Sequence, residues 1–329
     1  MATAKRRTAR VPAMMRAAAI DRVGGPEVLT LHTLPVPSLN PGDVLIALHT
    51  AGVGGWDADM RGGWWPGKRP PFPIVLGTDG SGTVAAVGSG VRRFTPGDIV
   101  YAYGFGDPKG GFYAEYVAIA AERVGHPPKI LSMREAGALA TTGLTAVQGV
   151  DDVLRIKRGE SVAIHGASGA VGSMALQFAK MRGARVLATA SGTEGIRFVR
   201  RLGADAAADG RHDDLAEAAM RFAPDGLDAV LAFAGGKPLT RLLDAIKRGG
   251  RVAYPNGVEP APRKRRGIRV LAYDGEAGVR EFERLGKAIE KARLKVPIAA
   301  SYPLGRAVAA HERLGKGHVL GKIVLRVQD

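Results

Sequence analysis

The sequence predicts an α/β fold in which a doubly wound parallel-sheet domain is inserted into a β-rich domain. Between residues 138 and 296, short apolar strands alternate with helices, which is the pattern of a parallel sheet with helices on both faces. Residues 15–137 instead contain short alternating or β-branched runs separated by Pro and Gly, which indicates a β-rich domain. A chain of 329 residues also exceeds what one hydrophobic core usually fills, so two domains are expected.

The individual elements follow from these patterns in chain order. The strands expected in the β-rich domain are 44–49, 82–87 and 98–103. The strands expected in the parallel sheet are 161–165, 184–190, 228–232, 250–254 and 268–272. After Pro297 a short helix at 304–314 and a last strand at 322–327 are expected to rejoin the first domain. The predicted segments are a basic disordered tail at 1–14, a substrate domain at 15–137 and 297–329, and a cofactor domain at 138–296.

The formal net charge of +16 is spread along the chain. One basic cluster, Arg263 to Arg266, is flanked by prolines and is most simply a solvated loop. No recognition helix or aromatic-interleaved sheet accompanies it. We therefore expect no specific nucleic-acid binding.

Cysteine is absent, which excludes disulfides, thiolate zinc sites and a cysteine nucleophile. No apolar run approaches the roughly 18 residues that are needed to span a membrane. The basic first ten residues are not followed by the apolar segment of a secretory signal. A cytoplasmic protein without a membrane span is therefore expected.

A glycine-rich turn between a predicted strand and a predicted helix is the most informative motif. From Val171 the apolar residues recur at helical spacing, and Gly183 is the expected C-cap. Small residues in the turn let the backbone approach a pyrophosphate and let the helix lie close to the strand, while the helix N-terminus attracts phosphate. The pattern therefore predicts a dinucleotide-binding site. The residues assigned to it are Gly166, Ala167, Ser168, Gly169, Ala170, Val171 and Gly172.

The end of the next strand, 184–190, indicates which dinucleotide binds. An NAD site normally has an acidic residue there, which binds the ribose 2′-hydroxyl. This chain has no acid at that point and continues with Ser191, Thr193 and Arg197. Hydroxyls and a guanidinium suit a 2′-phosphate, so we predict NADPH as the cofactor. The structural alternative is that Ser191 and Glu194 form a capping box and that the arginines lie on a solvated helix face.

Seven segments give the chain a resemblance to a known family. They are MRAAAIDRVGGPEVL, PGDVLIALHTAGV, LGTDGSGTVAAVGSGVRRFTPGDIV, GGFYAEYV, TTGLTA, HGASGAVG and HERLGKGHVLGKIVL. In this order they resemble the zinc-independent medium-chain dehydrogenase/reductases of the quinone oxidoreductase, or ζ-crystallin-like, group. The resemblance covers nearly everything from Met15 onward. It implies a GroES-like substrate domain interrupted by a Rossmann domain, an active-site cleft between the two, and a homodimer or homotetramer.

The resemblance also bears on metal binding. Zinc-dependent relatives would place Cys and His at Gly54 and Gly55, and His and Glu at Thr78 and Asp79. Only Asp79 has a ligand side chain here, whereas a catalytic zinc needs three protein ligands. No metal is therefore expected. The chemistry that remains is hydride transfer from reduced nicotinamide to an acceptor that needs little activation, with the protein supplying orientation and exclusion of water.

The loop AGVGGWDADMRGGWWPG departs from the quinone-reductase pattern, which has Asn at Gly54 and tyrosines at Asp59 and Trp65. No catalytic residue is assigned, and the candidates for the substrate cleft are Trp56, Asp57, Asp59 and Trp65. An indole gives a flat acceptor an apolar face but donates no proton as an acid at neutral pH, and its alternative role is to pack the domain. Asp57 is expected to fix the loop by hydrogen bonds. Water or the nicotinamide ribose hydroxyl is the expected proton source.

Further cofactor contacts are carried over from the resemblance. They are Thr142 and Thr145 in TTGLTA, Ala234 and Gly235 in AFAGG, and Asn256 with Gly257 after the fifth strand. Threonines that open a helix are equally expected as caps. Lys322 is expected either to approach the cleft or to form a surface salt bridge, and His165 to be a packed residue at a strand end.

These observations together predict a zinc-free NADPH-dependent oxidoreductase that transfers hydride to a quinone or an α,β-unsaturated carbonyl, which is a small hydrophobic or planar acceptor. Within the same class, the alternative is a reductase of enoyl thioesters or of a pathway intermediate. An alternative of another class is a non-catalytic NADPH-binding sensor or a nucleic-acid-associated protein. The missing Asn and tyrosines and the basic loop motivate that alternative.

Overall fold

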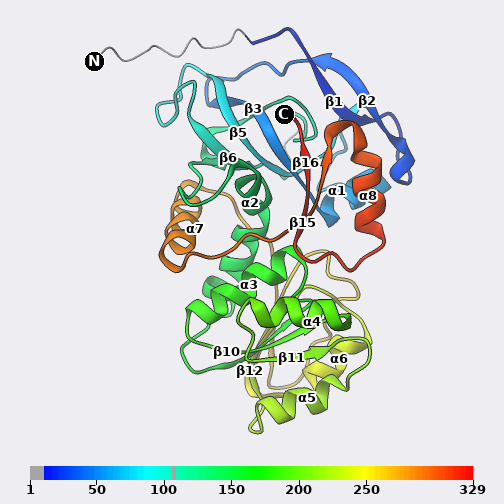
Figure 1. The fold of residues 1–329 in the computed structure, drawn as a ribbon, viewed down its shortest axis with the longest axis vertical. Helices are drawn as coiled ribbons and strands as arrows, with labels where there is room; N and C mark the ends of the chain where they lie inside the picture. Colours follow the sequence, from blue (N-terminus) through cyan, green and yellow to red (C-terminus); the bar gives the residue numbers. More distant parts are fainter. Residues whose placement is uncertain (1–10, 106–108, 329) are drawn as a thin grey trace.

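The computed structural model describes residues 11–105 and 109–328, which form two parts placed one above the other (Figure 1). The lower part contains a six-stranded sheet, and the upper part contains a seven-stranded and a three-stranded sheet. Most of the predicted N-terminal tail lies outside the described residues. Strand β1 already begins at Met14.

The six-stranded sheet is parallel, with the strand order β11-β10-β9-β12-β13-β14. Its strands are β9 (Ser161–His165), β10 (Arg185–Ala190), β11 (Ala206–Asp209), β12 (Leu227–Ala232), β13 (Ile246–Pro255) and β14 (Arg269–Tyr273). Five lie where the sequence predicts them. Strand β11 was missed because its four residues, AAAD, are too few and too uniform to show a strand pattern. The strand order reverses between β9 and β12, and this is the point at which such sheets bind ligands.

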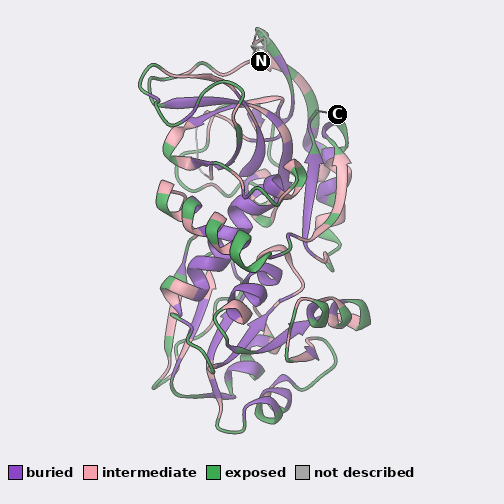
Figure 2. Cartoon of the chain, turned by 60° about the vertical axis from the view of Figure 1, so that its left-hand side comes forward, coloured by how far each residue is buried: buried purple, intermediate pink, exposed green. Residues whose placement is uncertain are grey.

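Helices cover both faces of this sheet, as a doubly wound fold requires. They are α3 (Ala170–Met181), α4 (Gly192–Arg201), α5 (Leu215–Phe222) and α6 (Lys237–Leu243). Helix α7 (Val279–Ala292) lies away from this sheet, against the helix Met133–Gln148 and the strand Val124–Gly125 (Figure 1). Val162 and Ile164 of β9 pack into the core that contains α3, whereas Ala163 between them packs into the core that contains α5 and α6. Because neighbouring strand residues enter opposite cores, the strands are buried on both faces (Figure 2). The predicted fold class is confirmed.

The upper part is built from antiparallel strands and from the end of the chain. The seven-stranded sheet contains β15 (Ile298–Pro303), β16 (Lys322–Arg326), β3 (Asp43–Val53), β5 (Asp79–Val87), β6 (Ile99–Tyr103), β8 (Val124–Gly125) and β7 (Tyr116–Ala120). The smaller sheet contains β2 (Leu29–Pro35), β1 (Met14–Ile20) and β4 (Ile74–Val75). Two short helices complete this part, α1 (Gly55–Gly62) and α8 (Ala307–Gly315). Strand β16 pairs with β3, so the closing segment lies beside the N-terminal strands (Figure 1).

Helix α2 (Met133–Gln148) lies between the two parts and crosses the predicted domain boundary at 137/138. Ser132 caps it, because Glu135 N donates to Ser132 Oγ at 3.3 Å and Ser132 N donates to Glu135 Oε2 at 2.8 Å. A Cβ on Gly137 would lie 2.7 Å from the side chain of Thr50, so glycine allows α2 to lie directly on β3. The helix therefore holds the substrate part and the cofactor part in contact.

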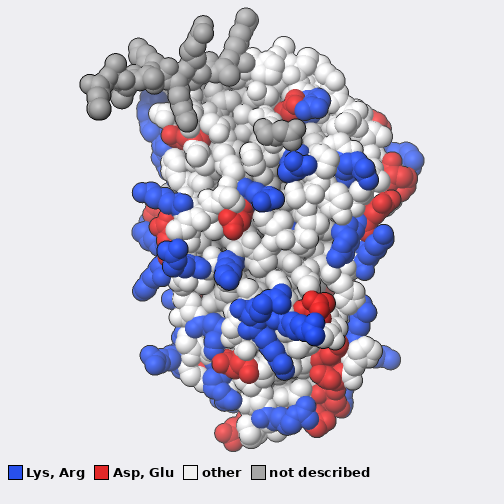
Figure 3. All heavy atoms as spheres, in the orientation of Figure 1, with Lys and Arg blue, Asp and Glu red and all other residues white. Residues whose placement is uncertain are grey.

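On the face that Figure 3 shows, Lys and Arg side chains are spread over both parts, with acidic residues among them. Arg265, in the predicted basic loop, pairs with Asp244 of the α6 end at 2.6 Å and also donates to Thr240 O. Part of this cluster is therefore engaged within the fold. Across the described ranges, no helix has the length and apolar character to cross a bilayer.

Candidate active site

A cleft of about 590 Å³ lies between the two parts, beside the carboxyl ends of β9 and β12. The cofactor part contributes the glycine turn and the loops that follow its strands. The substrate part contributes Val53 at the end of β3, the start of α1 and Lys322 of β16. The predicted site residues that line this cleft are Trp56, Asp59, Thr142, Thr145, Gly166, Ser168, Gly169, Ala170, Val171, Gly172, Ser191, Ala234, Asn256 and Gly257. The predicted residues that do not line it are Asp57, Trp65, Ala167, Thr193, Arg197 and Gly235.

The glycine turn has the geometry of a phosphate cradle. Gly166 has a φ of +76°, which favours glycine, and a Cβ on Gly172 would lie only 2.2 Å from Gly166 O. Helix α3 therefore begins close against the turn. Gly169 is its N-cap and has no side chain to satisfy the first N–H groups. Those donors, together with the positive end of the helix dipole, fit the pyrophosphate of a dinucleotide.

The substrate part is attached to this turn by a direct backbone contact. Gly321 N donates to Ser168 O at 2.9 Å, and Gly321 also forms a β-bridge with Gly169. Gly321 has a φ of +105°, and a Cβ there would lie 2.4 Å from Pro297 O, so this position requires glycine. Lys322, the next residue, is thereby placed beside the cradle.

Near the end of β10, only one of the three residues predicted to bind the ribose phosphate lines the cleft. Ser191 lines the cleft as the N-cap of α4, but its side chain makes no capping bond, so the alternative capping-box interpretation is wrong. Glu194 instead accepts from Arg197 Nη1 at 2.7 Å, on the exposed face of α4. Thr193 and Arg197 lie away from the cleft, whereas Arg211 lines it.

Arg211 is a residue that the sequence analysis missed. It follows β11, the strand that was not predicted, and the carboxylate of Asp209 accepts from both Arg211 N and Gly192 N at 2.9 Å. One carboxylate thus joins the loop after β11 to the loop after β10. The position of Arg211, two residues beyond the end of β11, could have identified it as a cleft residue. That inference required β11 to be predicted as a strand, and it was not.

At the other end of the cleft, Thr142 and Thr145 lie in the middle of α2 and not at its start. The prediction that they open a helix was therefore wrong, because α2 begins nine residues before Thr142, at Met133. Thr142 Oγ1 donates to Ala138 O at 2.7 Å, a common arrangement for a threonine inside a helix. Both residues face the cleft from the helix that joins the two parts.

Aromatic side chains form one wall of the cleft. Trp56 stacks on Trp64 with ring centroids 5.1 Å apart and contacts Phe105 at 4.9 Å. The indole of Trp56 also approaches Gly257, where an added Cβ would lie 3.0 Å from it. Trp56 therefore extends from the substrate part to the loop after β13. Its flat surface is suited to a planar apolar ligand.

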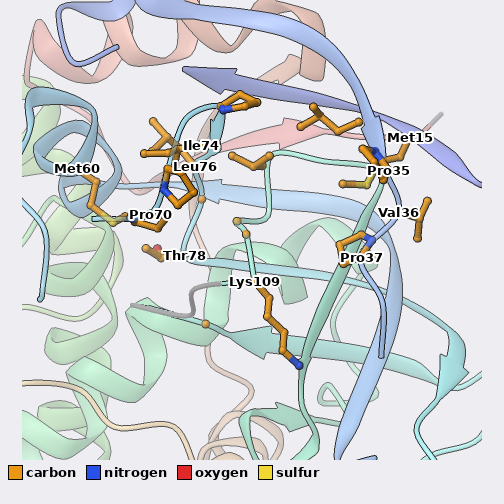
Figure 4. Close-up of a pocket in the computed structure, with 18 of the residues that line it drawn as sticks. Met15, Pro35, Val36, Pro37, Met60, Pro70, Ile74, Leu76, Thr78 and Lys109 are labelled. Atoms are coloured by element: carbon orange, nitrogen blue, oxygen red, sulfur yellow. The ribbon is translucent and has the colours of Figure 1, made fainter. Parts of the chain in front are cut away.

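Trp65 lines a second cavity, of about 560 Å³. Met60, Leu76 and Thr78, which also line it, are labelled in Figure 4. The cavity is lined by apolar side chains such as Met60 and Leu76 and by several prolines. Thr78 lines both cavities. Trp65 therefore contributes to the inside of the β-rich part, and Trp56 is the indole that faces the cofactor turn.

Asp57 is buried directly beneath the cleft loop. Its Oδ2 accepts from Gly54 N at 2.8 Å and from the Tyr113 hydroxyl at 3.1 Å, while its Oδ1 has no hydrogen-bond partner within the described ranges. Burial raises the pKa of Asp57 from 3.8 to about 7, against the opposing effects of the Lys322 ammonium and the Gly54 N–H. Asp57 thus holds the start of α1 in place.

A chain of hydrogen bonds supports Asp57 from behind. Arg61 Nη1 lies 3.1 Å from His311 Nδ1, and His311 Nε2 lies 3.1 Å from the Tyr113 hydroxyl. A guanidinium can only donate, so Nδ1 accepts and Nε2 carries the proton that it donates to Tyr113. Burial lowers the pKa of His311 to about 3 and keeps the ring neutral. The hydroxyl of Tyr113 is thereby directed at Asp57.

His165 behaves as predicted, as a packed residue at the end of β9. It is 5% exposed, and its Nδ1 shares a hydrogen bond of 2.7 Å with Thr189 Oγ1. Burial lowers its pKa to about 4, so the ring is neutral at physiological pH.

The positions at which zinc-dependent relatives carry ligands converge on the cleft. Gly54, Gly55 and Thr78 line it, and Asp79 is fully buried beside it. Asp79 Oδ2 accepts from Thr141 N at 3.0 Å, and its Oδ1 faces the Lys322 ammonium at 3.4 Å. Within residues 11–105 and 109–328, no group of three or more His, Asp or Glu side chains is arranged to hold a metal ion. This donor set does not fit a catalytic zinc.

A doubly wound sheet with a phosphate cradle, facing a β-rich domain across a cleft, defines a nicotinamide-dependent oxidoreductase. Comparison with known proteins agrees. The family model described as "Alcohol dehydrogenase GroES-like domain" matches residues 40–129, and the model described as "Zinc-binding dehydrogenase" matches residues 202–325. The chain belongs to the medium-chain dehydrogenase/reductase family, in its quinone oxidoreductase group.

Three relatives illustrate the range of this family. The quinone oxidoreductase of Rattus norvegicus is 33% identical over 95% of this chain and 98% of its own length. The chloroplastic NADPH-dependent alkenal/one oxidoreductase of Arabidopsis thaliana is 30% identical over 96% of this chain and 81% of its own. A crystal structure described as an NAD-dependent alcohol dehydrogenase is 33% identical, with a TM-score of 0.89, 95% of this chain covered and 100% of that chain.

Proposed function

We propose that this protein is a zinc-free, NADPH-dependent reductase of quinones or of α,β-unsaturated carbonyls. One observation carries the proposal: the glycine turn and the aromatic wall at Trp56 line the same cleft. Three of the positions at which zinc-dependent relatives carry ligands also line it, and here they are Gly54, Gly55 and Thr78, which are not zinc ligands. The names of the rat and Arabidopsis relatives support the same class of acceptor.

Each part of the cleft has a role in this reaction. The N-terminus of α3 binds the pyrophosphate, and Ser191 with Arg211 binds the 2′-phosphate. When bound, the reduced nicotinamide supplies a hydride. We assign Thr142, Thr145 and Asn256, which line the cleft, to contacts with the nicotinamide, and Trp56 to orienting a flat acceptor and excluding water.

Zinc-dependent alcohol oxidation is the competing reaction, since one similar structure is described as an alcohol dehydrogenase. It requires a metal held by three side chains of N, O or S type, and this chain offers only Asp79 at the corresponding positions. Asp79 is moreover engaged by Thr141 N and Lys322. We therefore expect a chelator to leave reduction unchanged and added zinc to produce no alcohol oxidation.

The acceptor is tested with a panel that contains a benzoquinone, a naphthoquinone, a short enone, an enoyl thioester and a primary alcohol with NAD⁺. The expected result is NADPH oxidation that depends on quinone or enone, measured by the loss of NADPH absorbance. Reduction of only the enoyl thioester would replace the proposed acceptor. Tight NADPH binding without turnover on any member would support a cofactor-binding sensor and refute an enzyme.

The cofactor is tested by a matched pair of charge reversals. Arg211→Glu removes a cation from the cleft, whereas Arg197→Glu removes one from an exposed helix face. We expect Arg211→Glu to weaken NADPH at least about tenfold relative to NADH, because a charge-assisted bond to the 2′-phosphate is lost. Arg197→Glu should leave that ratio unchanged. Equal affinities for NADPH and NADH in the unaltered protein would overturn the choice of cofactor.

The proposal includes a homodimer or homotetramer in the cytoplasm. Light scattering after size-exclusion chromatography measures the assembly, and a monomer at micromolar concentration would contradict that part.

A further inference from the structure

Lys322 is buried in the wall of the cleft, and its ammonium lies beside Gly54, a position at which zinc-dependent relatives would carry a ligand side chain. The residue is 5% exposed, although lysine is among the residues least often buried. Its Nζ lies 3.4 Å from the point where a side chain on Gly54 would begin. A Cβ on Gly52 would collide with Cε of Lys322 at 2.7 Å, so glycine on β3 makes room for this chain. The cation is therefore built into the cleft.

One buried carboxylate, Asp79, contacts this ammonium, and a second buried carboxyl group, Asp57, is close enough to feel its charge. Asp79 Oδ1 lies 3.4 Å from Lys322 Nζ. A Cβ added to Gly54 would lie 3.4 Å from Lys322 Nζ and 3.8 Å from Asp57 Oδ2. Asp79 is anchored by Thr141 N, and Asp57 is anchored by Gly54 N and Tyr113. Both anchors use Oδ2 of the carboxyl group, and this leaves each Oδ1 without a hydrogen bond inside the described ranges. The carboxylate of Asp79 thus lies beside the Lys322 ammonium, and the N–H groups of Lys322 face the cleft, where they are available to a ligand.

We propose that Lys322 is a catalytic residue that stabilises the negative oxygen of the acceptor and supplies its proton. This rests on the proposed function. A hydride adds to the acceptor with its two electrons, forming a C–H bond as the nicotinamide C4–H bond breaks, and the electron pair that it displaces moves to the acceptor oxygen. Lys322 Nζ then donates a proton to that oxygen, so an O–H bond forms and an N–H bond breaks. Solvent returns the proton to the neutral amine.

The geometry explains how reduction proceeds in a cleft whose loop lacks the tyrosines of the quinone-reductase pattern. A positive group facing the developing oxyanion in a water-poor cleft stabilises the transition state. The four candidates in the loop are less suitable, and one of them, Trp65, lines the second cavity instead of the cleft. Trp56 is not an acid at neutral pH, Asp57 is covered by the loop, and Asp59 lines the cleft without a cation partner in the described ranges.

The test uses 4-nitrophenol, whose anion mimics the reduced acceptor oxygen and absorbs visible light. It is titrated with the protein without cofactor, so the readout does not depend on turnover. In the unaltered protein we expect the bound phenol to ionise at a pH about one to three units below that of the free phenol. In Lys322→Met this shift should vanish, and kcat with quinone should fall about 10²- to 10⁴-fold.

Two further variants keep the test decisive if Lys322→Met folds poorly. Lys322→Met combined with Asp79→Asn removes both charges of the pair, so no uncompensated carboxylate stays buried. Lys322→Arg keeps the charge but gives up no proton, so it should retain the phenolate shift and lose turnover. Lys316→Met, at an exposed lysine near the same end of the chain, is the control and should change neither readout.

The outcomes separate this proposal from its competitors. If the phenolate shift is absent in the unaltered protein, or persists in Lys322→Met, the assignment is wrong. If NADPH affinity, measured by nucleotide fluorescence, falls tenfold or more while the phenolate shift persists, Lys322 is a cofactor anchor. Full turnover in Lys322→Arg would overturn the proton-donor role. A phenolate shift that requires Lys322, in a protein that reduces no quinone or enone, would leave this assignment standing and refute the proposed function.

Discussion

Replacement of Asp57 by asparagine removes an ionisable group that the fold buries completely. Asparagine preserves the shape and the hydrogen bonds. Its amide oxygen can accept from Gly54 N and Tyr113, as Oδ2 does, and its NH₂ takes the place of Oδ1. A protonated Asp57 would carry its hydroxyl at this same position. The variant therefore mimics the neutral form of the native residue.

The size of the effect follows from the pKa of this carboxyl group. Burial raises it from 3.8 to about 7 in the folded protein. The folded protein thus binds this proton more tightly than the unfolded chain, so the free energy of unfolding falls as the pH rises from about 4 to about 7. A difference of about three pKa units corresponds to at most about 4 kcal/mol. In Asp57→Asn, which has no ionisable group at this position, this fall in the free energy of unfolding with rising pH is absent.

The assay is urea unfolding followed by the fluorescence of the three tryptophans, at pH 5 and pH 8. We expect Asp57→Asn to match the unaltered protein more closely at pH 5 and to exceed its stability at pH 8 by about 2–4 kcal/mol. Asp225→Asn, at an exposed position, is the control and should follow the native profile. Parallel profiles for Asp57→Asn and the native protein would mean that Asp57 is ionised throughout, paired with Lys322, and would refute the reasoning.

Three further predictions concern the glycine turn, the cap of α2 and the aromatic wall of the cleft. Gly172→Ala places a methyl group 2.2 Å from Gly166 O. Thermal unfolding should show a loss of about 1–3 kcal/mol in stability, and titration with NADPH should show weaker binding. The control, Gly286→Ala, has open space around it and should stabilise α7 by up to about 1 kcal/mol. Ser132→Ala should cost about 1 kcal/mol through loss of the α2 cap, and an unchanged melting temperature would contradict it. Trp56→Ala should raise KM for planar quinones more than for a short enone, and equal changes would remove the stacking role.

Sequence patterns predicted the cofactor part well because its signals are local. The strand 161–165 and the glycine turn lie within a dozen residues, and both appear as predicted. Strand β11 was not predicted, because its four residues are too few to show a strand pattern. As a result, Arg211, which follows β11 and lines the cleft, was not predicted as a site residue. The prediction named Arg197 and did not consider Arg211, although both arginines follow strands that end at the same edge of the sheet, and it is Arg211 that lines the cleft.

The sequence by itself determined that a dinucleotide is bound and that three of the four zinc positions lack ligand side chains, because both conclusions depend on residue type at short spacing. Only the tertiary structure decided which tryptophan faces the cofactor and that Lys322 enters the cleft. From the sequence alone, Lys322 was expected either to approach the cleft or to form a surface salt bridge. The difference lies in long-range packing: β16 pairs with β3, and the glycine at 52 leaves the space that the Lys322 side chain fills. No local pattern around residue 322 contains that information.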